Sequence, residues 1–538
     1  MFLNIIIHKY MNKSKTPVTV SVPIPVGYLS KRGYVLKKEQ FTPQELLQLK
    51  TELRARPLVD TKFNAPSVNA IDSTFPMYIE TKNKIYIPKM YGISKYGLPD
   101  KMLDNYIGNN WETDIPFTGT LYPRQIEPVN KLIESCKKNG GGILSLSTGG
   151  GKTISSLAVL AELKGKTIIV VNKIPLMKQW ELEIKQFLPN AKVAIIQGQK
   201  INNDLISKSD ITIAMLQSLA RIDYPDSLFE DYQCVVIDEI HNTASRVFSQ
   251  ILFKLCCKYT IGLSATPKRS DGCEYVFKWH IGEIVYKSTT ERKGLDPIIR
   301  LLKIDSSDYK EINSINKFTG QKQIQFTSML SELVEMPKRN ALIIELIKDL
   351  VTQKRKILVL SDRRGHLTLL KKELNNQKVK FTYDLFVGGM KIKDLDISKS
   401  CDVILATVQA FGEGVSVAAL DTMILCTPKK FVGHIKTAVK ADSGKLEQIV
   451  GRIFRREHID ISPLIIDLFD NFSVYKNQSA GRKIFYKQHF TNGIFEDQSI
   501  NLDETCVEKI DMSCIKNKKK SKAIETDSKP ITQFCLLE

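Results

Sequence analysis

Short, continuous runs of apolar residues alternate with longer amphipathic segments over most of the chain. Between residues 120 and 285 the apolar runs include "TIIVV", "ITIAM", "CVVIDEI" and "YTIGLSA", and helical segments separate them. The alternation returns after residue 335 in "KILVLSD", "DVILATV", "DTMILCT" and "PLIIDLFD". Strands that are apolar throughout are typical of a parallel sheet covered by helices on both faces. The pattern therefore predicts two tandem α/β lobes, each built on a parallel sheet.

The region before the first lobe follows a different pattern. Stretches such as "RGYVLKK" and "FPMYIETKNKIYIPKMYG" are β-rich and aromatic, and "TPQELLQLKTEL" predicts a helix with Thr42 as its N-cap. We expect an N-terminal α+β accessory domain at 1–115, a first lobe at 116–285, an inter-lobe connection at 286–335, a second lobe at 336–490 and a C-terminal extension at 491–538. The lysine-rich stretch 516–530 predicts a basic, disordered tail at the end of that extension.

The composition narrows the class of protein. The 538 residues include 78 Lys+Arg and 58 Asp+Glu, a net charge of +20 that suits a nucleic-acid partner, although a basic surface kept for solubility explains it equally well. Ten cysteines without a CxxC pair argue against a zinc ribbon or a disulfide scaffold and favour a reducing compartment. No apolar run approaches the roughly 20 residues that span a bilayer, and the start "MFLNIIIHKYMNKSK" lacks the features of a signal peptide. We expect a soluble intracellular protein.

The stretch "GILSLSTGGGKTISSLAVLAEL" has the layout of a phosphate-binding loop, because an apolar strand runs through glycines into a helix. The residues expected to bind ATP there are Ser147, Thr148, Gly149, Gly150, Gly151, Lys152 and Thr153. Backbone N–H groups and the helix dipole would hold the phosphates, Lys152 would reach the β- and γ-phosphates, and the Thr153 hydroxyl would bind Mg²⁺. Leu146 stands where the strict motif requires a first glycine, so a glycine-rich loop before an ordinary helix is the alternative.

A pair of acids follows the apolar strand "CVVI" further along the chain. Asp238 at the end of a strand can hold Mg²⁺ through water, and Glu239 can orient and deprotonate an attacking water. Acid pairs also occur in plain surface turns. The two motifs together nevertheless favour an ATP hydrolase that uses ATP and Mg²⁺.

The chain resembles the superfamily-2 helicases of the DExH type over residues 120–470. The second motif of that family is matched by "DEIH". Further matches follow in the family's order: "LYPRQ" (121–125), "IIVVNKIPLMKQW" (168–180), "IAMLQSL" (213–219), "GLSATPKRSDG" (262–272), "KILVLSDRRGHL" (356–367), "VILATVQAFGEGVSVAALDTMIL" (403–425) and "EQIVGRIFRR" (447–456). The resemblance implies two RecA-like P-loop NTPase lobes.

The resemblance also implies roles for single residues. Gln125 and Gly414 join the nucleotide site, Arg452 and Arg455 complete it from the second lobe, and Gln448 and His241 couple the γ-phosphate to Ser264 and Thr266. The residues implied in contacts with a nucleic-acid strand are Asn172, Lys173, Gln217, Ser218, Ser361, Arg363, Thr407 and Gln409, with added charge from Lys268 and Arg269. Such contacts hold phosphates without reading sequence. Each of these strand residues also has a purely structural interpretation.

Some segments resemble one branch of the family in particular. "QW" at 179–180 and "ATPKRSDG" resemble DNA-directed members, and "LSKRGYVLKK" and "YIETKNKIYIPKMYGISKYGLP" resemble the leader of the poxvirus-type transcript-release helicases of large cytoplasmic DNA viruses. This resemblance implies a 3′ to 5′ DNA helicase of viral transcription, repair or recombination, located in host cytoplasm or virion, with transcription machinery as a further partner. A duplex translocase or annealing enzyme, an RNA helicase, and a nucleic-acid-binding scaffold with an inactive ATP site stay open as alternatives.

Overall fold

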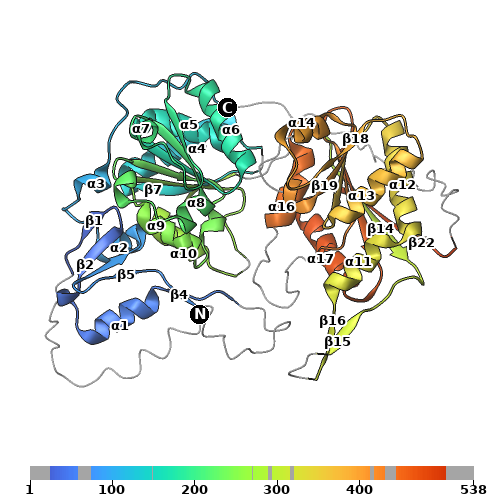
Figure 1. The fold of residues 1–538 in the computed structure, drawn as a ribbon, viewed down its shortest axis with the longest axis horizontal. Helices are drawn as coiled ribbons and strands as arrows, with labels where there is room; N and C mark the ends of the chain where they lie inside the picture. The colour runs from blue at the N-terminus through green and yellow to red at the C-terminus, as the bar shows by residue number, and fades with distance from the viewer. Residues whose placement is uncertain are drawn as a thin grey trace, which may run out of the picture. The chain divides into compact units, whose positions relative to one another are not determined.

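The computed structural model describes residues 25–58, 74–147, 149–269, 271–288, 294–315, 320–411, 417–429 and 444–504. The chain divides into two compact units, Met1–Thr290 and Glu291–Glu538 (Figure 1). Thr148, Gly414 and the stretch 516–530 lie outside the described residues, so their predicted roles stay predictions.

The first unit contains a sheet of seven strands, all of them parallel, in the order β13-β7-β12-β11-β8-β10-β9. The strands are β7 (Gly141–Ser145), β8 (Thr167–Val171), β9 (Val193–Ile196), β10 (Ile211–Met215), β11 (Cys234–Ile237), β12 (Tyr259–Ser264) and β13 (Ile284–Lys287). Every residue of β7, β8, β10 and β11 is buried. Strands that pack on both faces need apolar side chains on both, which explains the continuous apolar runs.

Helices cover both faces of this sheet. The helices α4 (Pro123–Asn139), α5 (Lys152–Leu163) and α6 (Ile174–Phe187) share one hydrophobic core with Leu144, Ile169 and Val171 of the strands. The helices α7 (Asn203–Ser207), α8 (Leu216–Arg221), α9 (Ile251–Lys254) and α10 (Glu274–Ile281) share the opposite core with Ile143, Ile168 and Val170. Successive strand residues thus point to opposite cores, as the two-residue period of a strand requires.

The N-terminal region folds around a small antiparallel sheet in the order β1-β2-β6-β5. Its elements are β1 (Tyr28–Ser30), β2 (Gly33–Lys37), α1 (Pro43–Glu52), β3 (Arg54–Ala55), β4 (Phe75–Pro76), β5 (Ile79–Glu80), β6 (Lys84–Ile87), α2 (Lys89–Tyr96) and α3 (Asp104–Ile107). The helix α1 begins after Thr42, whose hydroxyl accepts the Glu45 N–H in a capping box, so the predicted N-cap is confirmed.

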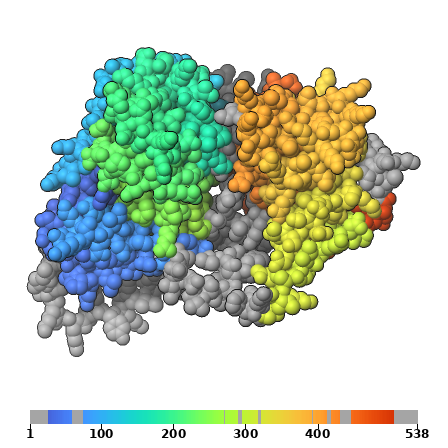
Figure 2. All heavy atoms as spheres, viewed as in Figure 1, coloured from blue at the N-terminus to red at the C-terminus, as the bar shows by residue number. Residues whose placement is uncertain are grey.

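The N-terminal region and the first lobe form one compact unit, whereas the sequence predicted a separate domain. Lys89 explains part of this: its ammonium is wholly buried and donates to the carbonyls of Gly140 and Cys257 at 2.9 Å. Burial lowers the pKa of Lys89. In Figure 2 the blue atoms of this region lie directly on the green atoms of the first lobe.

The second unit contains another seven-stranded parallel sheet, in the order β18-β19-β17-β20-β21-β14-β22. The strands are β14 (Ile298–Asp305), β17 (Ile357–Ser361), β18 (Tyr383–Phe386), β19 (Val403–Thr407), β20 (Thr422–Leu425), β21 (Leu464–Asp470) and β22 (Ile494–Asn501). One core holds α11 (Phe326–Glu335), α12 (Pro337–Thr352) and α13 (Arg364–Asn376). The other holds α15 (Val408–Phe411), α16 (Gly444–Val450), η7 (Gly451–Phe454) and α17 (Ser473–His489). The predicted fold class, two tandem RecA-like lobes with parallel sheets, is confirmed.

Two segments differ from the expected organisation. Residues 286–335, expected to be an inter-lobe connection, contribute β14, which lies inside the second sheet between β21 and β22. Residues 491–538, expected to be an extension, contribute the edge strand β22. Both strands carry charged residues that obscure the apolar pattern, for example the Arg300–Glu496 ion pair at 2.8 Å between them.

Helices long and apolar enough to cross a membrane are absent from the part of the chain that the structure describes.

The core of the second unit contains two buried ion pairs between side chains. On β21, Asp470 accepts two hydrogen bonds from Arg339 of α12, at 2.8 and 2.9 Å, and Asp467 accepts two from Arg482 of α17, at 2.7 and 2.8 Å. The two acids are three residues apart, so each faces a different core. Each ion pair ties a helix to β21.

Breaking one of these pairs should destabilise the second unit strongly. Arg339→Ala leaves the Asp470 carboxylate buried and without its partner, so we expect a loss of about 3–5 kcal/mol in the free energy of unfolding. The control is Lys399→Ala, since Lys399 pairs with Asp396 on the surface and should cost less than about 1 kcal/mol. Urea unfolding followed by circular dichroism measures both, and equal losses would contradict the role given to the buried pair.

Candidate functional site

Five neighbouring strands of the first sheet end in the predicted motif residues. The phosphate loop follows β7, Ser264 ends β12, and Asp238 follows β11. Next along the sheet, Asn172 follows β8 and Gln217 lies just after β10. Because the carboxyl ends of parallel strands share one edge, all these loops meet there. The predicted nucleotide residues occupy one part of the edge and the predicted strand-contacting residues the adjoining part.

The phosphate loop needs its glycines. Gly149 and Gly151 have φ angles of 82° and 79°, in the left-handed region that favours glycine, and α5 begins directly after Gly151. A Cβ atom at Gly151 would overlap the side-chain amide of Gln125. The loop is closed by the Gly150 N–H, which donates to the Ser147 carbonyl at 2.9 Å. Such a loop at a helix N-terminus is suited to holding an anion.

Gln125 belongs to this loop in space as well as in motif. It is buried on the first turn of α4, and its side-chain carbonyl accepts the Tyr122 N–H at 2.9 Å. Its amide nitrogen faces Gly151. The structure therefore brings Gln125 to the candidate nucleotide site.

A lysine and two carboxylates form the charged centre of the site. Lys152 Nζ lies 3.6 Å from Glu239 Oε1, and both side chains are largely buried. The Asp238 carboxylate accepts the Trp180 indole N–H at 3.0 Å and the Glu239 backbone N–H at 2.9 Å. Burial and the neighbouring Glu239 raise the pKa of Asp238 to about 6, while Lys152 opposes the shift. One lysine thus faces two buried acids.

The donor set fits Mg²⁺. Thr153, Asp238 and Glu239 offer oxygen atoms, the ligands that this hard cation prefers, and a divalent cation would offset the negative charge that Lys152 alone does not balance. Among the described residues no cluster of three or more His, Cys, Asp or Glu side chains forms a complete metal cage. An incomplete protein shell is typical of Mg²⁺ held jointly by protein and phosphate oxygens.

Glu239 has an unusual backbone conformation. Its φ and ψ angles are 49° and 56°, in the left-handed region that residues with a Cβ rarely adopt. The turn is held by Asn242, whose backbone N–H donates to the Glu239 carbonyl at 2.9 Å. Conformations of this kind cluster at functional sites, since the surroundings must stabilise them. Here the turn places the Glu239 carboxylate between Lys152 and His241.

His241 joins the acids to the loop after β12. Its Nδ1 lies 3.4 Å from the Glu239 carboxylate and 3.3 Å from the Ser264 hydroxyl oxygen. That hydroxyl oxygen accepts the Thr266 N–H at 3.1 Å. A continuous series of contacts therefore runs from Lys152 to Thr266, and it contains both predicted coupling residues.

Two residues of this centre have roles that sequence reasoning did not assign. Trp180 holds Asp238, and Arg269, expected to add charge near a strand, donates to the His241 carbonyl and to the Asp271 carboxylate. The sequence does not indicate that the buried Trp180 indole donates to Asp238, because the two residues lie far apart along the chain. The Arg269-x-Asp271 spacing is a signal for a local ion pair, but it does not reveal the contact with His241.

In the first unit, two of the residues predicted to contact a nucleic-acid strand make hydrogen bonds within the protein. The Gln217 amide donates to the Asn172 carbonyl at 2.8 Å, and the Ser218 hydroxyl accepts the Gly198 N–H at 3.0 Å. Asn172 and Ser218 are buried, whereas Lys173 and Gln217 are half-buried. These contacts connect the segment after β10 with the loops after β8 and β9.

In the second unit the predicted residues again follow strands. Ser361 ends β17 and is wholly buried, and its hydroxyl bonds to His366 Nδ1 at 3.0 Å and accepts the Arg363 N–H at 3.1 Å. Thr407 ends β19, and Gln409 just beyond it is exposed. The Ser361 hydroxyl is therefore used inside the protein, while Gln409 faces solvent.

The arginines of the last motif lie on one short stretch of the second unit. Gln448 is buried on α16, Arg452 is buried on η7, and Arg455 follows η7 and is half-buried. The structure thus gathers these three predicted residues in one segment.

The chain is similar to one family model and to several viral proteins. Residues 118–269 match the family model described as "Type III restriction enzyme, res subunit". A protein of Acanthamoeba polyphaga mimivirus, provisionally named an ATP-dependent RNA helicase, is 31% identical over 472 residues, which cover 86% of each chain. A protein of Invertebrate iridescent virus 6, provisionally named a helicase, is 26% identical and covers 69% of this chain and 82% of its own length. An African swine fever virus protein, also provisionally named an ATP-dependent RNA helicase, is 24% identical and covers 70% and 74%.

The raised pKa of Asp238 predicts a pH dependence of stability. Between its ordinary value of 3.8 and about 6 the folded protein holds a proton that the unfolded chain has released. The contribution of Asp238 to the free energy of unfolding therefore falls as the pH rises through this window.

Asp238→Asn removes this titration. Unfolding of wild type and variant, compared without metal or nucleotide, should show the variant gaining on the wild type as the pH rises through the window. The exposed Asp204→Asn serves as the control and should run parallel to the wild type. A difference between wild type and Asp238→Asn that does not change with pH would contradict the raised pKa.

Proposed function

The chain belongs to the superfamily-2 helicases of large DNA viruses, and on that premise we propose that it is a 3′ to 5′ DNA helicase of viral transcription, such as transcript release, or of repair and recombination. Membership makes it an ATP-hydrolysing, nucleic-acid-binding enzyme. The series of contacts from Lys152 through Glu239 and His241 to Ser264 supports the ATP-hydrolysing part of the proposal, and the resemblance of the motifs and of the N-terminal segments to DNA-directed members supports the rest.

The residues of the charged centre divide the chemistry between them. Lys152 and the backbone N–H groups of 149–151 hold the ATP phosphates, and Thr153 and Asp238 hold Mg²⁺. Mg²⁺, when bound with ATP, neutralises charge on the phosphate oxygens. Glu239 orients the attacking water and takes its proton. Gln125 contacts the adenine, as the motif before α4 implies.

The contact of His241 with Ser264 supports a coupling role. A change at the γ-phosphate alters the position of Glu239, and His241 passes that change to Ser264 and Thr266. Gln448, Arg452 and Arg455 supply the γ-phosphate contacts that the last motif implies, since an arginine fork suits the charge on the phosphate oxygens. Thr148 and Gly414 are proposed members of the nucleotide site on their motifs alone.

Binding of a nucleic-acid strand is proposed at the residues that end or follow β8, β10, β17 and β19. These are Asn172, Lys173, Gln217, Ser218, Ser361, Arg363, Thr407 and Gln409. Backbone N–H groups in these loops and the exposed side chains contact phosphates, while the buried hydroxyls shape the loops. Transcription machinery is the proposed partner, in the host cytoplasm or the virion.

An RNA helicase is the second candidate, because the mimivirus and African swine fever virus relatives carry that name. A duplex translocase is a third. Strand displacement on partial duplexes of DNA and of RNA, each with a single-stranded 3′ tail or 5′ tail, separates these proposals. The proposed function expects displacement of DNA with a 3′ tail. Displacement of RNA alone supports the second candidate, and ATP hydrolysis on blunt DNA without any displacement supports the third.

Glu239→Gln should separate binding of ATP from its hydrolysis. The amide keeps the shape of the side chain but cannot take a proton, so we expect ATP affinity within a few-fold of wild type and hydrolysis lowered by about 100-fold or more. Lys152→Ala should lower both hydrolysis and ATP affinity, since it removes the positive charge that contacts the phosphates. Fluorescent-nucleotide binding and phosphate release measure the two effects.

The control is Glu181→Gln, because Glu181 pairs with Lys178 on the surface of α6 and should leave both measurements unchanged. A normal hydrolysis rate in Glu239→Gln would mean that another group is the base.

A further inference from the structure

One face of the N-terminal sheet carries aromatic and basic side chains. In the register of β1, β2 and β6, Tyr28 lies opposite Val35, and Val35 lies opposite Tyr86, so Tyr28 and Tyr86 share a face. Both tyrosines are only half-buried. The opposite face, which includes Leu29 and Tyr34, is fully buried in a hydrophobic core with α1 and α2. The Tyr28 face lies outside that core, and Val35 between the two tyrosines is itself fully buried.

Two lysines lie beside the Tyr28 ring. Lys84 Nζ donates to the Tyr28 hydroxyl at 2.9 Å and lies 5.5 Å from the centre of its ring, and Lys101 Nζ lies 5.7 Å from the same ring centre. The hydrogen bond with Tyr28 raises the pKa of Lys84, so Lys84 is charged at neutral pH. The Tyr28 ring thus has ammonium groups close by, as the aromatic surfaces that bind nucleic acid do.

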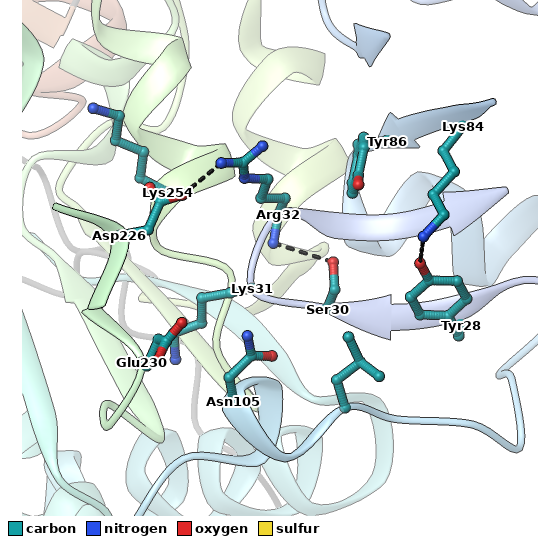
Figure 3. A pocket seen from close by; sticks show the side chains of 11 residues that line it. Tyr28, Ser30, Lys31, Arg32, Lys84, Tyr86, Asn105, Asp226, Glu230 and Lys254 are labelled. Carbon is teal, nitrogen blue, oxygen red and sulfur yellow. Dashed lines mark hydrogen bonds and ion pairs between the residues drawn. The ribbon is translucent and has the colours of Figure 1, made fainter. Parts of the chain in front are cut away.

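A cavity of about 250 Å³ adjoins this face. Its walls include Tyr28, Lys84 and Tyr86 on the N-terminal sheet, Arg32 in the β1–β2 turn, and Asp226 and Lys254 of the first lobe. Figure 3 shows Arg32 and Lys254 on one side, Tyr28 with Lys84 on the other, and the Ser30 hydroxyl between them. The cavity is open to solvent on the side of the charged groups, since the side chains of Arg32 and Asp226 are 48% and 57% exposed.

The existing ion pairs do not prevent an anion from binding. Arg32 pairs with Asp226, and Lys254 pairs with Asp223 at 3.1 Å, in both cases at the surface. Exposed pairs of this kind contribute little stability, so Arg32 and Lys254 can exchange these carboxylates for a phosphate, while Asp226 and Glu230 stay on the cavity wall. Lys31 is not available, because its buried ammonium donates to the Tyr232 carbonyl.

The cavity lies away from the motif loops. Tyr232, which Lys31 contacts, precedes β11, and Lys254 precedes β12. Because the strands are parallel, these residues mark the amino edge of the first sheet, whereas the phosphate loop and Asp238 lie at its carboxyl edge. A ligand in the cavity would therefore occupy a site separate from the candidate nucleotide site.

We propose that Tyr28, Tyr86, Arg32, Lys84 and Lys254 form an accessory site for single-stranded nucleic acid, here called the tyrosine platform. Bases stack on the two tyrosine rings, and phosphates contact Arg32, Lys84 and Lys254. Stacking accepts any base, so the site binds without sequence preference. It goes beyond the proposed motor function, because it holds a second stretch of strand while the motif loops act on the first.

Cross-linking locates the site directly. The full-length protein, without ATP, is irradiated with single-stranded DNA or RNA oligomers that carry 5-iodouracil, and the cross-linked peptides are identified by mass spectrometry. The platform predicts cross-links at Tyr28 or Tyr86. Because ATP is absent, this result does not depend on whether the motor function is correct. Cross-links confined to other peptides would overturn the proposal.

Matched variants test the role of the rings. Tyr28→Leu/Tyr86→Leu removes both rings and keeps apolar bulk, whereas Tyr28→Phe/Tyr86→Phe keeps both rings. We expect the leucine variant to lose the cross-link and to bind a labelled oligomer about tenfold or more weakly, by fluorescence anisotropy. The phenylalanine variant should stay within about twofold of wild type. Equal affinities of the two variants, with thermal unfolding showing that both are folded, would overturn the proposal.

The charges are tested by salt dependence. Arg32→Gln/Lys254→Gln should lower the slope of log affinity against log salt by about one for each phosphate that the variant no longer binds. Lys208→Gln, which removes an exposed lysine at the end of α7, is the control and should leave the slope unchanged.

Free thymidine monophosphate, used as a competitor of the oligomer, tells a site for a mononucleotide from a site for a nucleic-acid strand. Competition at micromolar concentration would mean that the site takes a mononucleotide and would overturn binding of a strand.

Discussion

The adjacent carboxylates of Asp238 and Glu239, buried at the end of β11, are the constraint on which the rest of the first unit depends. Two negative charges in a largely buried position are costly unless donors and a cation compensate them. Here Trp180 of α6 and a backbone N–H satisfy Asp238, and Lys152 of α5 faces Glu239. These contacts connect α5 and α6, which pack on one face of the sheet, to the end of β11. An incoming phosphate and its cation fit the same arrangement.

Contacts around Glu239 also connect the site with the loop after β12 and with the N-terminal region. His241 contacts both Glu239 and Ser264, and Arg269 holds the His241 carbonyl while it pairs with Asp271. The Asp271 carbonyl in turn accepts the N–H of Leu58, in the N-terminal region, at 2.9 Å. A change at the acids can thus reach both the loop after β12 and the N-terminal region.

The sequence predicted the features that are encoded locally. Continuous apolar runs indicated the strands and their parallel arrangement, and Thr42 followed by Glu45 indicated the start of α1. The motifs identified Lys152, Asp238 and Glu239 before any geometry was available. Features that depend on distant contacts were not predictable: Lys89 inserts into the first lobe, Trp180 finds Asp238, and β14 joins the second sheet. Motifs also do not give orientation, so the burial of Ser361 could not be read from its position.

We propose that Asp238, Glu239, Lys152 and the phosphate loop form an ATPase whose hydrolysis rate nucleic acid stimulates. The most direct test measures ATP hydrolysis by the purified chain while single-stranded DNA, duplex DNA or RNA is titrated at fixed salt, since salt alone changes such affinities by orders of magnitude. We expect saturable stimulation, with single-stranded DNA more effective than RNA. Hydrolysis that no nucleic acid stimulates, at saturating ATP and Mg²⁺, would contradict it.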